Sequence, residues 1–165
     1  MDILIREITV AEYPLLADFL YEAIFIPKGV EKPPREIIER EELQVYIRDF
    51  GSKKDDNCLV AEYNGKVIGA CWARIMRDYG HINDETPSLA ISLYEEYRGR
   101  GIGTKLMLRM SELLQRKEYK NMSLAVQKEN YAVRMYKKVG FRIVGENEQE
   151  YIMLHGFENA ENSGT

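Results

Sequence analysis

Three closely spaced glycines follow an apolar segment and form the most chemically informative feature of this sequence. Gly99, Gly101 and Gly103 come directly after residues 89–93, where leucine and isoleucine alternate with smaller residues, and apolar residues at helical spacing begin at Ile102. The glycines therefore predict a turn between a strand and a helix. N–H groups at a helix start have no partner inside the helix and lie at the positive end of its dipole. Such a turn can hold a phosphate or pyrophosphate, although the same glycines could serve only to make a tight connection.

Two common nucleotide-binding motifs do not fit this turn. The dinucleotide fingerprint requires a further glycine where Leu106 stands. The Walker lysine directly follows a glycine, whereas Lys105 follows Thr104. These two classes of nucleotide site are therefore excluded.

A second segment, residues 130–141, also follows an apolar strand-like run and opens a helix. Ala132 and Tyr136 are four positions apart and share a helix face, on which the small alanine leaves space beside the tyrosine ring. Gly140 lies just past the last apolar helical position and predicts the helix end. Taken alone, Tyr136 is interpreted as a packed core residue or as a catalyst.

The two segments together resemble the cofactor-binding motifs of the GNAT family of N-acetyltransferases. The first reads Arg98-x-x-Gly-x-Gly, and the second runs from Asn130 to the Gly-Phe pair that ends at residue 141. The order of elements is similar as well, so the resemblance covers residues 3–155. The sequence departs from the common family pattern at Glu95, where many members have proline.

The resemblance implies an α/β (α+β) fold, with a mixed central sheet of about six to seven strands flanked by about four helices. The strands near 88–94 and 122–126 should run parallel and diverge in a V, with the pantetheine arm of acetyl-CoA paired to the first of them. We expect one domain over residues 1–157 and a polar, disordered tail over 158–165.

The resemblance also implies an activity, the transfer of an acetyl group from acetyl-CoA to a primary amine by direct attack in a ternary complex. The Leu93 N–H would polarise the thioester carbonyl, and Tyr136 would protonate the departing thiolate, since a phenol of pKa ~10 is protonated at neutral pH and a thiolate has a pKa of about 8.5. The residues implied in acetyl-CoA binding are Ile91, Leu93, Arg98, Gly99, Arg100, Gly101, Ile102, Gly103, Thr104, Asn130 and Tyr136.

The general base and the acceptor are less well marked in the sequence. His81 and Glu22 are the candidate bases, and each could equally be a solvated surface residue. In the family the acceptor pocket is built by the first two helices, their connection and the hairpin strands. This directs attention to Tyr21, Phe25, Trp72 and Arg74, of which the last two share a strand face by alternation.

Elements elsewhere in the chain must position these residues. Thr9 and Glu12 have the spacing of a capping box and predict a first helix, whose start Pro14 could shift or whose first turn it could make irregular. A second helix is expected from Pro34 to a cap at Gly51. The Asn-Gly pair at 64–65 predicts a hairpin between two strand-like runs. Further strands are expected at residues 3–8, 141–144 and 151–154.

The composition limits the class of protein. The 165 residues suit one domain, and a net charge of −4 argues against nucleic acid as the main partner. The chain has no signal-peptide layout and no membrane-length apolar run, and its two cysteines lie in apolar segments, so we expect a cytoplasmic protein with no membrane partner and no disulfide. No metal is expected, and the protein would act as a monomer or homodimer. The alternative function is a non-catalytic module that binds or senses acyl-CoA.

Overall fold

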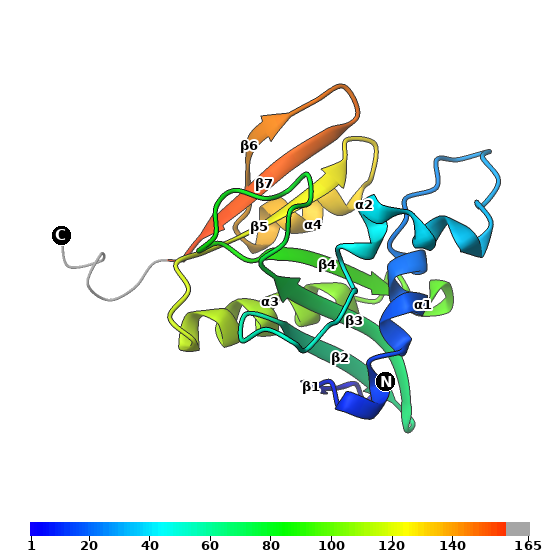
Figure 1. Ribbon diagram of the computed structural model, residues 1–165. Coiled ribbons are helices and arrows are strands. Elements are labelled where there is room, and N and C mark those ends of the chain that lie inside the picture. Colours follow the sequence, from blue (N-terminus) through cyan, green and yellow to red (C-terminus); the bar gives the residue numbers. More distant parts are fainter. Residues whose placement is uncertain (158–165) are drawn as a thin grey trace.

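The strand-forming segments pair into a single mixed sheet in the computed structural model of the protein, which describes residues 1–157 (Figure 1). Its seven strands are β1 (Leu4–Glu7), β2 (Asn57–Tyr63), β3 (Lys66–Arg74), β4 (Ser88–Leu93), β5 (Asn121–Gln127), β6 (Arg142–Glu146) and β7 (Glu150–Gly156). The order across the sheet is β1-β2-β3-β4-β5-β7-β6. The expected mixed sheet is therefore confirmed, whereas the tail expected at 158–165 lies outside the described residues.

The sheet opens between its two parallel strands. β4 and β5 pair at one position only, Ser88 with Ser123, and the Ser123 N–H donates to the carbonyl of Pro87 at 2.9 Å. All other neighbours pair antiparallel, and the partners of β4 and β5 on their outer edges remain in register along nearly their whole length. The expected V-shaped divergence between β4 and β5 is confirmed (Figure 1).

The hairpin between β2 and β3 follows from two residues that tolerate positive φ. Asn64 has φ of +50° and Gly65 has φ of +78°, and the flanking pair is Tyr63 with Lys66. Positive φ at both central positions is the requirement of the turn that best matches the twist of two antiparallel strands. The hairpin expected from the Asn-Gly pair is confirmed.

Helices cover both faces of the sheet. Within residues 1–157 the α-helices are α1 (Leu15–Glu22), α2 (Glu41–Gln44), α3 (Ile102–Arg116) and α4 (Ala132–Val139), with 3-10 helices at Val10–Glu12, Arg35–Glu39 and Glu95–Tyr97. One apolar cluster lies between α3, α4 and one face, and a second lies between α1 and the other face. Cys58 and Cys71 fall in different clusters, and both buried thiols are free.

The first helix begins later than the capping box predicts. The Thr9 N–H does donate to the Glu12 carboxylate at 3.0 Å, but only a 3-10 helix follows, and α1 starts at Leu15 with Pro14 as its N-terminal cap. Proline has no N–H to donate within a helix, so a helix begins readily at or just after it. The α-helix therefore starts about one and a half turns after the position that Thr9 suggests, which is the kind of shift expected from Pro14.

A continuous second helix from Pro34 to Gly51 is also wrong. The segment forms the 3-10 helix Arg35–Glu39 and then the four-residue α2, with Arg40 extended between them at φ −65° and ψ +144°. An extended residue interrupts the i to i−4 hydrogen bonds that a continuous helix requires. Turns follow α2 as far as Gly51, which has φ of +93°.

Candidate active site

The glycine-rich turn presents an open surface at the start of α3. Gly99 and Gly101 have φ of +75° and +81°, and a Cβ added at either would meet no heavy atom within 4 Å. At Gly103 a Cβ would meet only the Met135 Cε at 3.8 Å. The first N–H to bond back into the helix is that of Lys105, which donates to the Gly101 carbonyl at 3.2 Å. The preceding N–H groups therefore have no partner within the helix and lie at the positive end of a 15-residue helix, which suits an anionic group.

The Arg98 side chain is engaged within the protein. Its Nε donates to the Leu93 carbonyl at 3.1 Å, and its Nη2 donates to the Glu22 carbonyl at 3.1 Å and to the Glu22 carboxylate at 2.9 Å. The guanidinium thus ties the end of α1 to the end of β4, and Glu22 offsets its charge. Arg98 and Glu22 are thus paired with each other in this structure, and the contact of Arg98 with a pyrophosphate stays a prediction.

Backbone groups of β4 face the opening in the sheet. The Tyr94 N–H donates to the Ile68 carbonyl at 3.0 Å, and antiparallel strands bond at every second residue. The backbone groups of even-numbered β4 residues therefore point to β3, and those of odd-numbered residues point to β5. Because β5 has diverged beyond Ser88, the N–H and C=O of Ile91 and the N–H of Leu93 face the gap. The sequence assigned these two residues to the cofactor arm, which stays a prediction.

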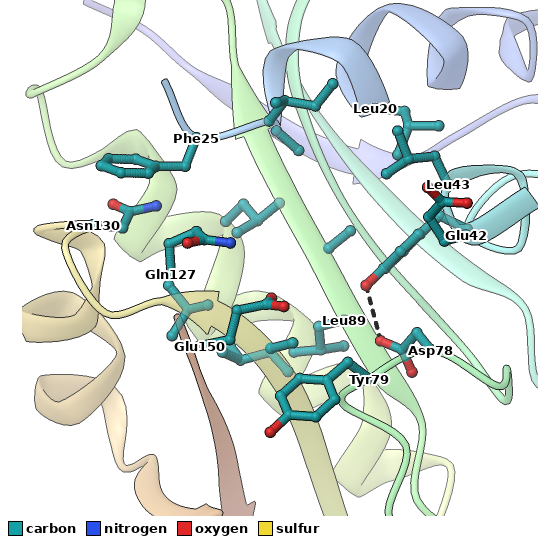
Figure 2. A pocket seen from close by; sticks show the side chains of 18 of the residues that line it. Leu20, Phe25, Glu42, Leu43, Asp78, Tyr79, Leu89, Gln127, Asn130 and Glu150 are labelled. Atoms are coloured by element: carbon teal, nitrogen blue, oxygen red, sulfur yellow. Dashed lines mark hydrogen bonds between the residues drawn. The ribbon is translucent and has the colours of Figure 1, made fainter. Parts of the chain in front are cut away.

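A cavity of about 440 Å³ lies in this opening. Its walls come from α1, α2, the β3–β4 connection, β4, β5, the start of α4 and the start of β7. Figure 2 shows Phe25, Gln127 and Asn130 at one end of it, and Glu42 and Asp78 at the other. The cavity thus brings residues of the second sequence motif together with residues from the loops.

Tyr136 lines this cavity with an unengaged hydroxyl. The side chain is only 7% exposed, and its ring packs edge-on to Phe141 with centroids 5.9 Å apart. Within residues 1–157 the hydroxyl forms no hydrogen bond, and its oxygen is not fully buried. Burial raises the pKa of Tyr136, so the phenol is protonated at neutral pH. These features fit a proton donor that faces a ligand.

Asn130 stands at the entry to α4 and also lines the cavity. Its Oδ1 accepts the Ala132 N–H at 2.9 Å, which fixes the side chain against the helix start. This bond is a local cap of the kind that Asn forms readily. The predicted contact of Asn130 with the cofactor arm remains a prediction.

Two carboxylates in the cavity were missed by sequence reasoning. The Tyr46 hydroxyl donates to Asp78 Oδ2 at 3.0 Å (Figure 2), and the Ser88 hydroxyl donates to Asp78 Oδ1 at 2.9 Å. Burial raises the pKa of Asp78. Burial and the nearby Asp78 raise the pKa of Glu150, which opens β7. No motif marks these residues, because the order of strands in the sheet brings them together.

Trp72 and Arg74 were expected at the acceptor site, and the structure places both elsewhere. Trp72 is fully buried in the apolar cluster beneath α1, where its Nε1 donates to the Tyr46 carbonyl at 2.9 Å. Arg74 is buried and donates to both carboxylate oxygens of Asp56 at 3.1 Å. Neither side chain lines the cavity, so this assignment is wrong.

The remaining candidates divide between the cavity and other places. Phe25 lines the cavity, whereas the Tyr21 hydroxyl donates to the Pro33 carbonyl at 2.6 Å and the residue does not line it. His81 lies in a separate depression with its Nε2 3.4 Å from Asp84 Oδ1. His81 is therefore not placed to act as a base in the cavity that Tyr136 lines.

The fold and site define a class of protein, an α/β domain with an opening between two parallel strands and a glycine-rich helix start beside it. The sequence model of the acetyltransferase (GNAT) family matches residues 18–141, which is most of the chain. The chain belongs to this family of acyltransferases. No curated protein matches the sequence.

Solved structures share the fold at low sequence identity. The PaiA N-acetyltransferase of Thermoplasma acidophilum, in complex with coenzyme A, is 21% identical with a TM-score of 0.71, over 95% of this chain and 100% of that one. The ribosomal-protein-S18-alanine N-acetyltransferase of Escherichia coli is 14% identical with a TM-score of 0.67, over 96% of both chains. A putative streptothricin acetyltransferase of Bacillus anthracis, in complex with acetyl coenzyme A, is 17% identical with a TM-score of 0.65, over 96% of this chain and 100% of that one.

Neither a membrane span nor a metal cluster is found in the part of the chain that the structure describes. No helix within residues 1–157 combines the length and apolar composition needed to cross a membrane. Over the same range, no group of three or more His, Cys, Asp or Glu side chains is arranged to hold a metal ion.

Proposed function

We propose that the protein is an acetyl-CoA-dependent N-acetyltransferase that moves an acetyl group to a primary amine by direct attack in a ternary complex. One observation carries the proposal: a single cavity has the backbone groups of β4 on one wall and the unengaged hydroxyl of Tyr136 on another. The family match and the solved relatives with coenzyme A or acetyl-CoA bound support it.

The pyrophosphate of the cosubstrate would lie over the start of α3. The N–H groups of Ile102, Gly103 and Thr104 have no partner within the helix, and the space above Gly99 and Gly101 is open. The pantetheine arm would then pass into the opening and bond to Ile91 and Leu93 as an added strand. The thioester would reach the wall that Tyr136 lines.

The chemistry needs three groups around the thioester. The amine nitrogen attacks the carbonyl carbon while the Leu93 N–H donates to the carbonyl oxygen, on which negative charge develops. The C–S bond then breaks, and Tyr136 gives its proton to the thiolate. The attacking amine must lose a proton, and we assign that proton to Glu150 in place of His81 or Glu22. Burial and the nearby Asp78 raise the pKa of Glu150, and a carboxylate with a raised pKa accepts a proton more readily.

Tyr136→Phe tests this function, because it keeps the ring and removes the hydroxyl. With acetyl-CoA and a panel of amines, thiol release should show kcat lower by at least about tenfold, with the Kd for CoA changed little. Tyr131→Phe is the matched control, since Tyr131 is 77% exposed and does not line the cavity. A thioester with a more acidic thiol should recover much of the lost rate in the Tyr136 variant.

The outcomes separate the two functions that the sequence left open. Equal defects on both thioesters would mean that Tyr136 orders the site without donating a proton. CoA binding without turnover of any amine would instead favour the non-catalytic acyl-CoA-binding module. We keep a cytoplasmic location as part of the proposal, because both cysteines are free thiols of the kind that reducing compartments maintain.

A further inference from the structure

The cavity is rich in negative charge that the protein does not neutralise. Glu42, Asp78 and Glu150 line it, and none of them forms an ion pair within residues 1–157. The one basic residue of the lining, Arg77, lies 3.5 Å from the carboxylate of Asp84, which is outside the cavity. The charge of the lining therefore favours a cationic occupant.

Asp78 is the most strongly positioned of the three carboxylates. Each of its oxygens accepts a hydroxyl proton, one from Tyr46 and one from Ser88, so the side chain is held in one orientation. Neutral hydroxyl donors orient a carboxylate but do not compensate its charge, and an uncompensated buried charge is costly. A ligand ammonium placed beside Asp78 would relieve that cost.

Glu150 is positioned differently. Its backbone lies opposite that of Gln127 at the divergent end of β5, and within the described residues no donor bonds to its carboxylate. Figure 2 shows this carboxylate extending from β7 toward the side of the cavity where Asp78 lies. Glu150 is thus free to accept a proton, whereas Asp78 is held in one orientation by its two hydroxyl donors.

We propose that the acceptor carries two cationic groups, as an α,ω-diamine does. One amine reacts beside Glu150, and the other remains an ammonium ion paired with Asp78. This inference rests on the proposed acetyl transfer and adds its substrate class. An acceptor with a carboxylate in place of the second amine would be repelled by the same lining.

The test compares acceptors that differ only in the distal group. The full-length protein is assayed for thiol release from acetyl-CoA with propane-1,3-diamine to hexane-1,6-diamine, each against the n-alkylamine of equal length and the matching ω-amino acid. At the best length, kcat/KM for the diamine should exceed that for the alkylamine by about tenfold or more, the range of a charged hydrogen bond. The ω-amino acid should be the poorest acceptor.

Two isosteric variants test whether Asp78 causes the preference for the diamine. Asp78→Asn should bring the ratio of diamine to alkylamine kcat/KM to within about threefold of unity, since an amide cannot pair with an ammonium. Asp49→Asn should keep the ratio, because Asp49 does not line this cavity and asparagine tolerates its φ of +53°. A wild-type ratio near unity at every length, or a ratio that survives in the Asp78 variant, overturns the proposal.

The outcome also distinguishes failure of this inference from failure of the proposed acetyl transfer. If no amine is acetylated, the proposed acetyl transfer fails, and titration calorimetry on the CoA-loaded protein then tests the dication site directly. Diamine binding that exceeds alkylamine binding and is lost in Asp78→Asn supports the site. Equal binding of the two, or none, refutes it.

Discussion

Gly101 and Gly65 form a matched pair of positions that can isolate cofactor binding from backbone strain. Their φ values are +81° and +78°, and a Cβ added at either would meet no heavy atom within 4 Å. Gly65 lies in the hairpin turn between β2 and β3, whereas Gly101 caps the start of α3. Alanine therefore imposes the same strain at both positions, but only at Gly101 is the methyl group added at the start of α3, where the pyrophosphate is proposed to lie.

The expected magnitudes follow from these two effects. A left-handed alanine costs roughly 1–2 kcal/mol, so each variant should lose about that much free energy of unfolding. For a chain of this size the loss corresponds to a decrease in Tm of about 2–4 °C per kcal/mol. Gly101→Ala should also disturb hydrogen bonds to a charged phosphate, each worth about 1.5–3 kcal/mol, which is roughly a 10- to 150-fold increase in the Kd for CoA.

Thermal melts of the unliganded variants and calorimetric titration with CoA measure the two effects separately. The reasoning predicts similar decreases in Tm for both variants and weaker CoA binding for Gly101→Ala alone. If Gly101→Ala binds CoA as tightly as Gly65→Ala does, the glycine-rich turn is not the pyrophosphate site. If both variants lose affinity equally, the loss reflects a general destabilisation of the fold.

Three further substitutions test the framework around the site. Gly69→Ala should cost about 1–3 kcal/mol in urea unfolding, because its Cβ would lie 2.1 Å from the Leu93 Cδ2, and an unchanged midpoint would contradict this packing. Hydrogen bonds from Arg6 lower the pKa of Glu12 from 4.5 to about 2. Ionised Glu12 therefore stabilises the folded state fully above pH 4.5, and this contribution is lost as the pH falls to 2. Glu12→Gln should accordingly lower the free energy of unfolding by about 1 kcal/mol at pH 7 and have no effect near pH 2, and a difference that persists in acid would exclude the ionic origin. Arg98→Ala should weaken CoA binding by a factor that does not depend on salt concentration, because Glu22 already pairs with the charge of Arg98. A loss of CoA affinity that shrinks as salt rises would instead support a direct contact between Arg98 and a phosphate.

Elements fixed by local chemistry could be predicted from the sequence. The hairpin turn depends on two adjacent residues that tolerate positive φ, and α3 depends on an apolar stripe long enough to cover the sheet. The segment that contains α2 could not be predicted in this way. Its apolar residues have helical spacing, but short helices gain little stability from propensity alone, and contacts elsewhere decide their limits.

The candidate site likewise contains residues that a sequence motif marks and residues that only the fold brings together. Tyr136 and Asn130 could be placed because they belong to one motif on one helix start. Asp78 is separated by 32 residues from Tyr46, to which it is bonded, so no spacing in the sequence reports the contact. Trp72 and Arg74 do alternate along β3 as predicted, but alternation identifies a shared face and not what covers it.

The divergence of β4 from β5 links the cofactor proposal to the acceptor proposal. A backbone N–H or C=O that loses its strand partner must find another one, so the opening favours water or a ligand that can bond like a strand. The same opening admits other side chains because no strand fills it, and Asp78 from the β3–β4 connection and Glu150 from the start of β7 line it. A strand-like arm that ends in a thioester would therefore reach the carboxylates suited to a cationic amine. If β5 remained paired to β4 along its length, both the arm and the acceptor would lose their place together.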